Sequence, residues 1–141
     1  MKKHLFLVPI AALLIVFASS CGSTCKMANK NKLTAQPWEL STLDGKAPNM
    51  SEFRTGMPFL IFAGKGKLSG STSCNNMAGN YQLKKACLKL DPGAITRMAC
   101  QGNGETLFLD ALKKVEMMKL DGDKLILLDG TKEIMTLLPK K

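Results

Sequence analysis

Cysteine is the residue type in this chain with the widest range of possible chemistry. The 141-residue sequence contains five cysteines, and their positions are Cys21, Cys25, Cys74, Cys87 and Cys100. A thiol can accept a lipid, form a disulfide, bind a soft metal ion or take part in redox exchange. No Cys-x-x-Cys pair occurs, so the spacing does not favour a thioredoxin-like redox site.

The first twenty residues have the pattern of a secretory signal peptide. Lys2 and Lys3 supply a positive start, an apolar run extends from Leu5 to Phe17, and small residues follow it. The apolar run is too short to cross a bilayer as a permanent helix. We therefore expect residues 1–20 to be a signal peptide that is removed after export.

Cys21 directly follows the small residues Ala18-Ser19-Ser20, and this arrangement resembles the lipobox of bacterial lipoproteins. In that class the thiol receives a diacylglycerol, the signal is cut before the cysteine, and the new amino group is usually acylated, with palmitate the expected chain. Each buried methylene contributes about 0.8 kcal/mol, so two or more chains hold a protein stably. We expect lipid attachment at Cys21; an ordinary signal with an incidental cysteine is the alternative.

Removal of the signal peptide also removes His4, which is the only histidine. The formal charge of +9 then becomes +7, because Lys2 and Lys3 are lost as well. Without histidine, Ser-His-Asp and Cys-His catalysis and the common histidine-based zinc sites are disfavoured. We expect no enzyme, metal or cofactor. An exported chain is not expected to bind nucleic acid, and the dispersed lysines favour a solvated surface over a lipid-binding patch.

Residues 22–32 are polar and lack apolar periodicity, which predicts a lipidated tether over 21–32 and one domain over 33–141. In that domain, short apolar runs alternate with turn signals such as Asp44-Gly45 and Asp129-Gly130, as in antiparallel strands. The expected strands are 38–40, 59–62, 67–71, 81–83, 86–90, 117–120, 124–128 and 134–138.

One segment has helical rather than strand periodicity. Its apolar residues lie on one face of a helix of about eleven residues that begins near Glu105. These residues are Leu107, Phe108, Ala111, Leu112 and Val115. The fold class is therefore α+β: a curved antiparallel β-sheet, or partial barrel, packed around one amphipathic helix.

A series of short motifs follows one another from about Leu33 to Leu138. They are Trp38-Glu39-Leu40, Phe62, Leu68-Ser69-Gly70, Cys74-Asn75 with Gly79 and Tyr81, Thr96-Arg97-Met98-Ala99-Cys100, and Glu105 with Phe108 and Leu112. In this order they resemble the META domain family, which includes the bacterial heat-shock protein HslJ. One departure lies in Ser69–Ser73, where the family often has a second glycine before the cysteine, so the conformation of this loop stays open.

The resemblance implies a small α+β domain, similar to secretin-pilot lipoproteins, with no established enzymatic activity. Members of the family are often envelope lipoproteins associated with stress, drug tolerance or motility. The family-motif positions expected to matter are Trp38, Gly70, Asn75, Gly79, Tyr81, Thr96 and Met98. From the residues alone, Asn75 and Thr96 fit turn or capping roles, Gly70 and Gly79 fit close backbone approach, and Trp38 fits the core.

The four cysteines other than Cys21 allow three full pairings. The family motifs contain Cys74 and Cys100, so the resemblance favours a disulfide between these two; a Cys25–Cys87 pair is a further possibility. A redox-active pair is the functional alternative. If the thiols stayed reduced, Met77 and Met98 near the motif cysteines would suit Cu(I), whereas methionines filling a core beside a disulfide would be the structural explanation.

The expected function is that of a non-catalytic envelope lipoprotein with a monomeric domain that binds a protein or envelope component and supports stress tolerance. The alternatives are a pilot-like chaperone for an outer-membrane assembly, with an apolar groove between sheet and helix, and a thiol-redox or metal-handling protein. Gly22 is not the aspartate that retains lipoproteins in the inner membrane of enteric bacteria. In a two-membraned organism we therefore expect the outer membrane, facing the periplasm.

Overall fold

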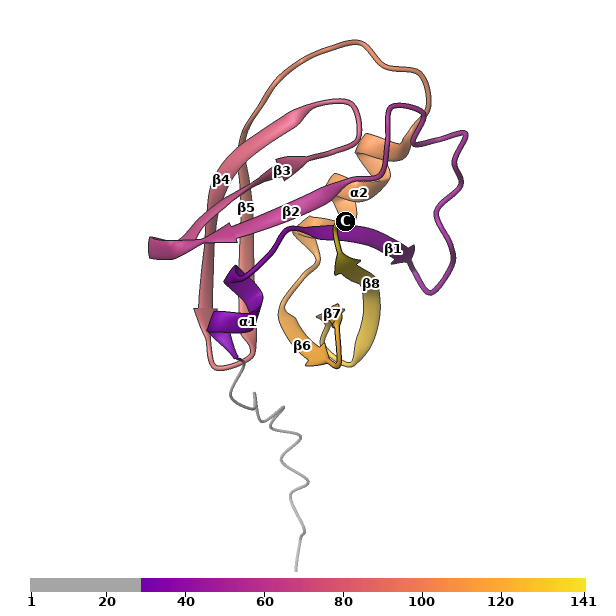
Figure 1. Cartoon of the computed structure of the whole chain (residues 1–141). Coiled ribbons are helices and arrows are strands. Elements are labelled where there is room, and N and C mark those ends of the chain that lie inside the picture. Colours follow the sequence, from indigo (N-terminus) through magenta and orange to yellow (C-terminus); the bar gives the residue numbers. More distant parts are fainter. Residues whose placement is uncertain (1–28) are drawn as a thin grey trace, which may run out of the picture.

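The structure is a computed structural model, and it describes residues 29–141. The expected signal peptide, the lipid attachment at Cys21 and the cysteine at position 25 lie outside the described residues. The helices and strands follow one another along the chain as shown in Figure 1. Their bounds are α1 Lys30–Thr34, β1 Trp38–Leu43, β2 Phe59–Ala63, the 3-10 turn η1 Gly64–Gly66, β3 Lys67–Ser71, β4 Asn76–Lys84, β5 Cys87–Ile95, α2 Gly104–Lys113, β6 Met117–Asp121, β7 Lys124–Asp129 and β8 Lys132–Pro139.

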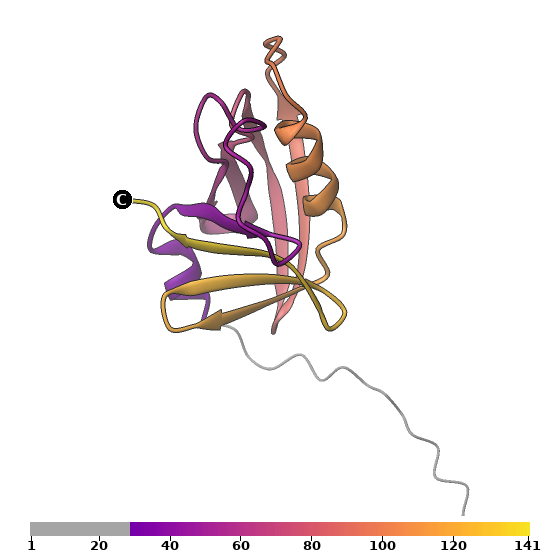
Figure 2. The ribbon, with the colours of Figure 1, turned by 90° about the vertical axis from the view of Figure 1, so that its right-hand side faces the viewer.

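The strands form one antiparallel ring in chain order, which closes because β8 pairs with β1 (Figure 1). The expected curved antiparallel sheet is confirmed. Strand pairing is shortest between β5 and β6, where the register contains a single pair, Cys87 with Met117. Helix α2 connects these two strands and packs against β5, so it lies where the two strands separate (Figure 2).

Alternating apolar residues on the strands build the core. Inward positions include Trp38 and Leu40 on β1, Leu60 and Phe62 on β2, and Leu125 and Leu127 on β7, all buried. β4 and β5 are longer than the sequence predicts. Most of their additional residues, such as Asn80 and Asp91, are exposed, so hydrophobic alternation does not mark them, although Met77 on β4 is buried. Asn80 and Asp91 are directly opposite each other on the paired strands β4 and β5.

Helix α1 begins at Lys30, within the segment that the sequence assigns to the tether. Asn29 caps the helix, since its side chain accepts a hydrogen bond from the backbone N–H of Lys32. Leu33 is fully buried, and its carbonyl accepts a 2.8 Å hydrogen bond from Trp38 Nε1. This one buried side chain connects α1 to the core, so the folded part begins before residue 33.

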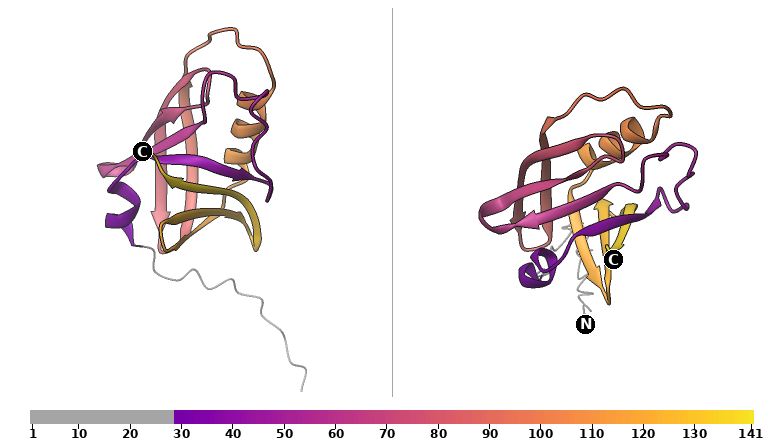
Figure 3. Two further views of the ribbon diagram at one scale, coloured as in Figure 1. Left: turned by 45° about the vertical axis from the view of Figure 1, so that its right-hand side comes forward. Right: turned by 45° about the horizontal axis from the view of Figure 1, so that its top comes forward.

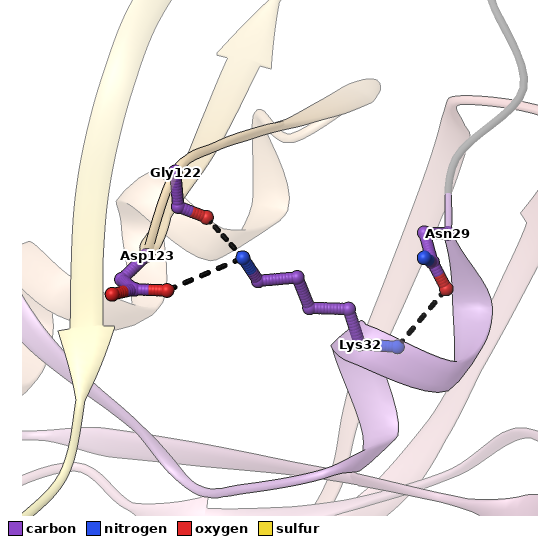
Figure 4. Close-up of polar contacts among 4 residues, drawn as sticks. All are labelled: Asn29, Lys32, Gly122 and Asp123. Atoms are coloured by element: carbon purple, nitrogen blue, oxygen red, sulfur yellow. Dashed lines mark hydrogen bonds and ion pairs between the residues drawn. The ribbon is translucent and has the colours of Figure 1, made fainter.

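A side-chain contact also holds α1 against the turn between β6 and β7. The Lys32 ammonium group donates to the carbonyl of Gly122 and lies 3.3 Å from the Asp123 carboxylate (Figure 4). α1 therefore lies at one end of the ring, and the β6–β7 turn and the β4–β5 turn lie at this same end (Figures 1 and 2). The loop over residues 96–103 lies at the opposite end, as two perpendicular views show (Figures 1 and 2).

Helix α2 buries Phe108, Ala111 and Leu112. Val115, just after the helix, is also buried, but Leu107 is 48% exposed. Leu107 precedes Phe108 by one residue, about 100° around the helix, and the buried stripe is centred on Phe108 and Leu112. The buried face of α2 is thus narrower than the apolar face that the sequence predicts. Within residues 29–141, neither helix has the length and apolar character needed to cross a membrane.

Candidate functional site

Three connections and the first turn of α2 meet at the end of the ring opposite α1 (Figure 3). The connections are residues 44–58 between β1 and β2, residues 72–75 between β3 and β4, and residues 96–103 between β5 and α2. Together they line a cavity of about 420 Å³ that is open to solvent on one side. We refer to it as the motif cavity, because its lining includes Cys74, Asn75, Met98, Cys100 and Glu105.

A disulfide between Cys74 and Cys100 forms one wall of the motif cavity. It is the pair that the family resemblance favours. The two Cα atoms lie 6.0 Å apart, and the cysteines are 26 residues apart in the sequence. The bond therefore links the β3–β4 connection covalently to the loop that leads into α2, and it restricts their separation.

The side chain of Asn75 holds the same loop by hydrogen bonds. Its Oδ1 accepts from the backbone N–H of Met98 at 2.7 Å, and its Nδ2 donates to the Met98 carbonyl at 3.3 Å. An amide side chain thus replaces the pair of backbone bonds that a neighbouring strand would make. Asn75 is only 4% exposed, so both bonds are shielded from competing water.

The sequence predicts that Thr96 caps or stabilises a local turn, but its hydroxyl instead contacts residues that lie 20 and 21 positions earlier in the chain. Its Oγ1 donates to Asn75 Oδ1 at 2.9 Å and accepts from the backbone N–H of Asn76 at 3.1 Å. The hydroxyl is committed to these two contacts where the loop leaves β5. The motif residues Asn75 and Thr96 therefore determine the loop conformation together.

The carboxylate of Glu105 completes this polar network, which we call the motif network. Its Oε2 accepts from Thr72 Oγ1 at 2.6 Å and from Asn75 Nδ2 at 2.8 Å. Thr72 is fully buried, and its own Oγ1 is tied to the backbone of Asn75. Hydrogen bonds to a charged group are stronger than those between neutral groups. The first turn of α2 is therefore connected to the β3–β4 turn through one carboxylate.

The network fixes the backbone of the loop but leaves several of its side chains exposed. Met98 is 60% exposed, and Arg97 and Ala99 are exposed as well. Met77, by contrast, is 3% exposed and lies in the core. The two methionines considered for a Cu(I) site thus differ in environment, and residues 29–141 contain no group of three or more His, Cys, Asp or Glu side chains placed to hold a metal.

The other family-motif residues lie in the ring and outside the motif cavity. A Cβ atom at Gly70 would overlap the carbonyl oxygen of Phe59, and one at Gly79 would overlap that of Asp91. The Tyr81 hydroxyl donates to the carbonyl of Ala63 at 3.1 Å, and burial raises the pKa of this tyrosine. These residues, like Trp38, support the position of the loops without lining the cavity.

Sequence reasoning missed several residues of the site, among them Thr72, Arg54, Gln101 and Glu52. Arg54 Nη1 donates to Gln101 Oε1 at 2.6 Å although 47 residues separate them in the sequence. Neither residue belongs to a motif or to an apolar run. The serine- and threonine-rich segment around Thr72 was the nearest available signal. It predicted a loop there but did not determine the conformation of that loop.

The comparisons with known proteins agree with this architecture. A family model described as the META domain matches residues 31–141. A protein solved by NMR has 24% sequence identity and a TM-score of 0.62, over 80% of this chain and 96% of that chain. A crystal structure of a DUF4847 family protein from Bacteroides vulgatus has 13% identity and a TM-score of 0.62, over 80% and 99% of the two chains.

An NMR structure of a protein from Burkholderia xenovorans has 22% identity and a TM-score of 0.55, over 100% of this chain and 99% of that chain. At these identities the structural similarities show the fold alone. None of the curated proteins matches the sequence.

Proposed function

This chain belongs to the META domain family, and we propose that it is a non-catalytic lipoprotein of the cell envelope whose META domain binds a protein or another envelope component. In this proposal lipid on Cys21 anchors the chain, and binding supports tolerance of heat, drug or envelope stress. In a two-membraned organism the domain faces the periplasm from the outer membrane.

The observation that carries the proposal is that the polar motif side chains form hydrogen bonds with one another and with the loop backbone. Asn75, Thr96 and Glu105 are hydrogen-bonded within the motif network, so they act as supports for a loop. A general acid or base must itself lie within hydrogen-bond reach of a substrate proton, whereas these three side chains form their hydrogen bonds within the chain. The same supports leave Met98 exposed on a fixed backbone, which suits recognition of a partner.

The positions of the two ends of the ring support an anchored binding domain. The described chain begins at Asn29, beside α1, while the motif cavity lies at the other end (Figure 1). Eight residues from Cys21 to Asn29 span at most roughly 28 Å when fully extended. A lipid on Cys21 would therefore keep α1 near the bilayer and direct the motif cavity away from it.

The anchor is tested by changing the residue that would carry the lipid. In the full-length protein expressed in bacteria, Cys21→Ser should move the chain from the membrane fraction to the soluble fraction or leave an uncleaved precursor. Intact-mass spectrometry of the wild type should show the added diacylglycerol and acyl chain. A wild-type mass without added lipid would contradict anchoring at this residue.

Partner binding is tested by pull-down from detergent-solubilised envelopes with the full lipoprotein as bait. Met98→Ser should reduce recovery of the specific envelope component at least several-fold. The matched control is Leu138→Ser, which changes another exposed apolar residue, 37% exposed, in β8. Equal recovery with both variants, or a deletion strain with unchanged stress survival and no recovered component, would count against the proposal.

The two alternative functions receive less support. A pilot-like chaperone would need an apolar groove between ring and helix, yet Phe108, Ala111 and Leu112 of α2 are already buried within the chain. A thiol-redox function would need an exchangeable Cys74–Cys100 bond. A native free-thiol count by mass spectrometry separates this case: a disulfide that stays oxidised at a periplasmic redox poise excludes it.

A further inference from the structure

The two arginines of the sequence, Arg54 and Arg97, both lie at the motif end of the ring, although the chain has twenty basic residues. Arg54 lines the motif cavity. Arg97 lines an adjoining cavity of about 660 Å³ that shares Asn75, Met98, Ala99 and Glu105 with the first. No lysine lines either cavity. This distribution matters because a planar guanidinium binds carboxylates through two parallel hydrogen bonds, whereas an ammonium group acts as a point charge.

The guanidinium of Arg54 is oriented by neutral groups. Its Nη1 donates to Gln101 Oε1 at 2.6 Å, and its Nε donates to the carbonyl of Ser51 at 3.3 Å. A guanidinium has five N–H donors, so several stay available for a ligand. Within residues 29–141, five lysines form ion pairs, whereas neither arginine forms one. The charge of Arg54 is thus held in position without an acidic partner.

The two carboxylates that line the motif cavity are committed elsewhere. Glu52 Oε2 accepts from the backbone N–H of Asn103, next to the start of α2. Glu105 Oε2 accepts from Thr72 and Asn75. Both carboxylates are hydrogen-bonded to neutral donors of the chain and keep their negative charge, but within residues 29–141 neither forms an ion pair with the guanidinium. An incoming carboxylate would find an oriented cation whose charge is not already paired.

Apolar groups lie beside this cation. The same cavity is lined by Met98, which is 60% exposed, by Ala99 and by the Cys74–Cys100 disulfide. A methionine side chain adapts its shape to varied apolar ligands. The cavity therefore presents a charged donor and an apolar wall to one ligand. A carboxylate with an apolar side chain close to it, as in an acidic peptide segment, has the matching chemistry.

We propose that the motif cavity binds a peptide carboxylate of a protein partner, with Arg54 donating to the carboxylate and Met98 contacting a neighbouring apolar side chain. This inference rests on the proposed binding function and specifies the chemistry of the partner. Arg97, exposed in the adjoining cavity, adds positive charge that attracts the acidic segment during encounter.

The inference is tested with the mature lipoprotein in detergent micelles and small peptide probes, by NMR titration. Two probes place a carboxylate beside leucine: acetyl-Ala-Leu-Ala with a free C-terminus, and acetyl-Ala-Leu-Glu-amide. Their neutral counterparts are acetyl-Ala-Leu-Ala-amide and acetyl-Ala-Leu-Gln-amide. We expect the backbone amides of Gln101 and Gly102 to shift with at least one acid probe, and the neutral counterpart to bind at least about tenfold more weakly. Binding of the first acid probe alone would indicate that the partner supplies its C-terminal carboxylate. Binding of the second alone would indicate that the partner supplies an acidic side chain.

Arg54→Gln should weaken acid binding about tenfold, and Arg54→Lys should restore it only in part, because lysine lacks the bidentate geometry. Lys46→Gln, an equal change of charge in the same connection but outside the cavity lining, should leave binding unchanged. Acid binding by the wild type should also fall with rising salt, a readout that does not depend on the fold of any variant.

Equal affinity for acidic and neutral probes, or undiminished acid binding by Arg54→Gln, would overturn the inference. Its failure is separable from failure of the proposed function. If Arg54→Gln recovers the same envelope component as the wild type in the pull-down, the binding function stands and the carboxylate inference fails.

Discussion

Among the non-glycine residues from 29 to 141, Ser73 has the backbone conformation that departs most clearly from ordinary geometry. Its φ is 90°, in the left-handed region that favours glycine. Its carbonyl accepts a 2.6 Å hydrogen bond from Thr55 Oγ1, which holds the turn against the β1–β2 connection. This is the segment where the sequence departs from the family pattern by lacking a second glycine before the cysteine, and the structure retains the conformation that such a glycine would favour.

Replacement of Ser73 by glycine should therefore stabilise the domain. A left-handed conformation costs a residue with a Cβ atom roughly 1–2 kcal/mol, and the lost hydroxyl contact with Thr55 offsets part of the gain. We expect Ser73→Gly to raise the free energy of unfolding by up to about 1 kcal/mol in urea denaturation. Ser73→Ala keeps the Cβ and loses the hydroxyl, so it should not be more stable than the wild type. A gain with alanine would contradict the backbone explanation.

Asn75 is the residue on which most of the motif network depends. Asn75→Ala removes the bonds to Met98 and Thr96 and one of the donors to Glu105. Buried groups left without partners cost about 1–3 kcal/mol, and more when charged. We expect a loss of about 3 kcal/mol in the free energy of unfolding, measured by thermal or urea denaturation.

The neighbouring Asn76 supplies the matched control for this prediction. Its side chain is exposed, and its bonds to Thr96 use the backbone. Asn76→Ala should change stability by less than about 0.5 kcal/mol. Similar losses at the two positions would show that the side-chain network is not the source of the effect.

At the scale of elements, the contact of β4 with β5 depends on small residues where the strands bend. The register shifts between Met77 and Ala78, and Gly79 lies next to this irregularity. Its missing side chain lets the backbone of Asp91 and Gly93 approach closely. β5 then continues to Ile95, from which the loop over residues 96–103 (the motif loop) starts. The position of the loop therefore depends on a glycine in a strand rather than on the loop residues alone.

Gly79→Ala should destabilise the domain by more than about 2 kcal/mol, because the new methyl group would overlap backbone atoms that cannot rotate away. Hydrogen exchange should accelerate most in β4, β5 and the motif loop. Gly64→Ala, where a Cβ would meet nothing within 4 Å, is the control and should be close to neutral. Unchanged exchange of the motif loop in Gly79→Ala would contradict the link between strand and loop.

At the scale of the whole molecule, the ring separates the start of the described chain from the motif cavity. α1 and the β4–β5 turn lie at the same end of the ring (Figures 1 and 2), and Lys32 ties α1 to the β6–β7 turn (Figure 4). The loop over 96–103 lies at the other end (Figures 1 and 2). A chain anchored through Cys21 should therefore approach the bilayer with a defined orientation.

This orientation can be measured on the lipidated protein in nanodiscs that contain headgroup spin-labelled lipid. The amide signals of Lys84 and Lys85 in the β4–β5 turn should broaden more than those of Ala99 and Gln101. Lys32→Ala, which removes the contact between α1 and the β6–β7 turn, should reduce the difference. Equal broadening at both ends in the wild type would show that the domain has no preferred orientation.

The sequence by itself determined the local elements. Alternating apolar residues and Asp-Gly turns marked the strands, because burial on one face of a strand depends on neighbours two residues apart. The helix near Glu105 followed from its period in the same way. α1 was missed because a short helix with one buried side chain, Leu33, has no period to detect.

Only the tertiary structure decided how these elements meet. β8 closes the ring by pairing with β1, and the site forms from contacts between Asn75 and Met98, Thr72 and Glu105, and Arg54 and Gln101. The partners in these three contacts are 23, 33 and 47 residues apart. The period of a sequence reports which face of its own element a residue occupies, and it carries no information about a partner on another loop. The cysteine motifs indicated that Cys74 and Cys100 could meet; the folded ring brings Arg54 and Met98 to the same cavity.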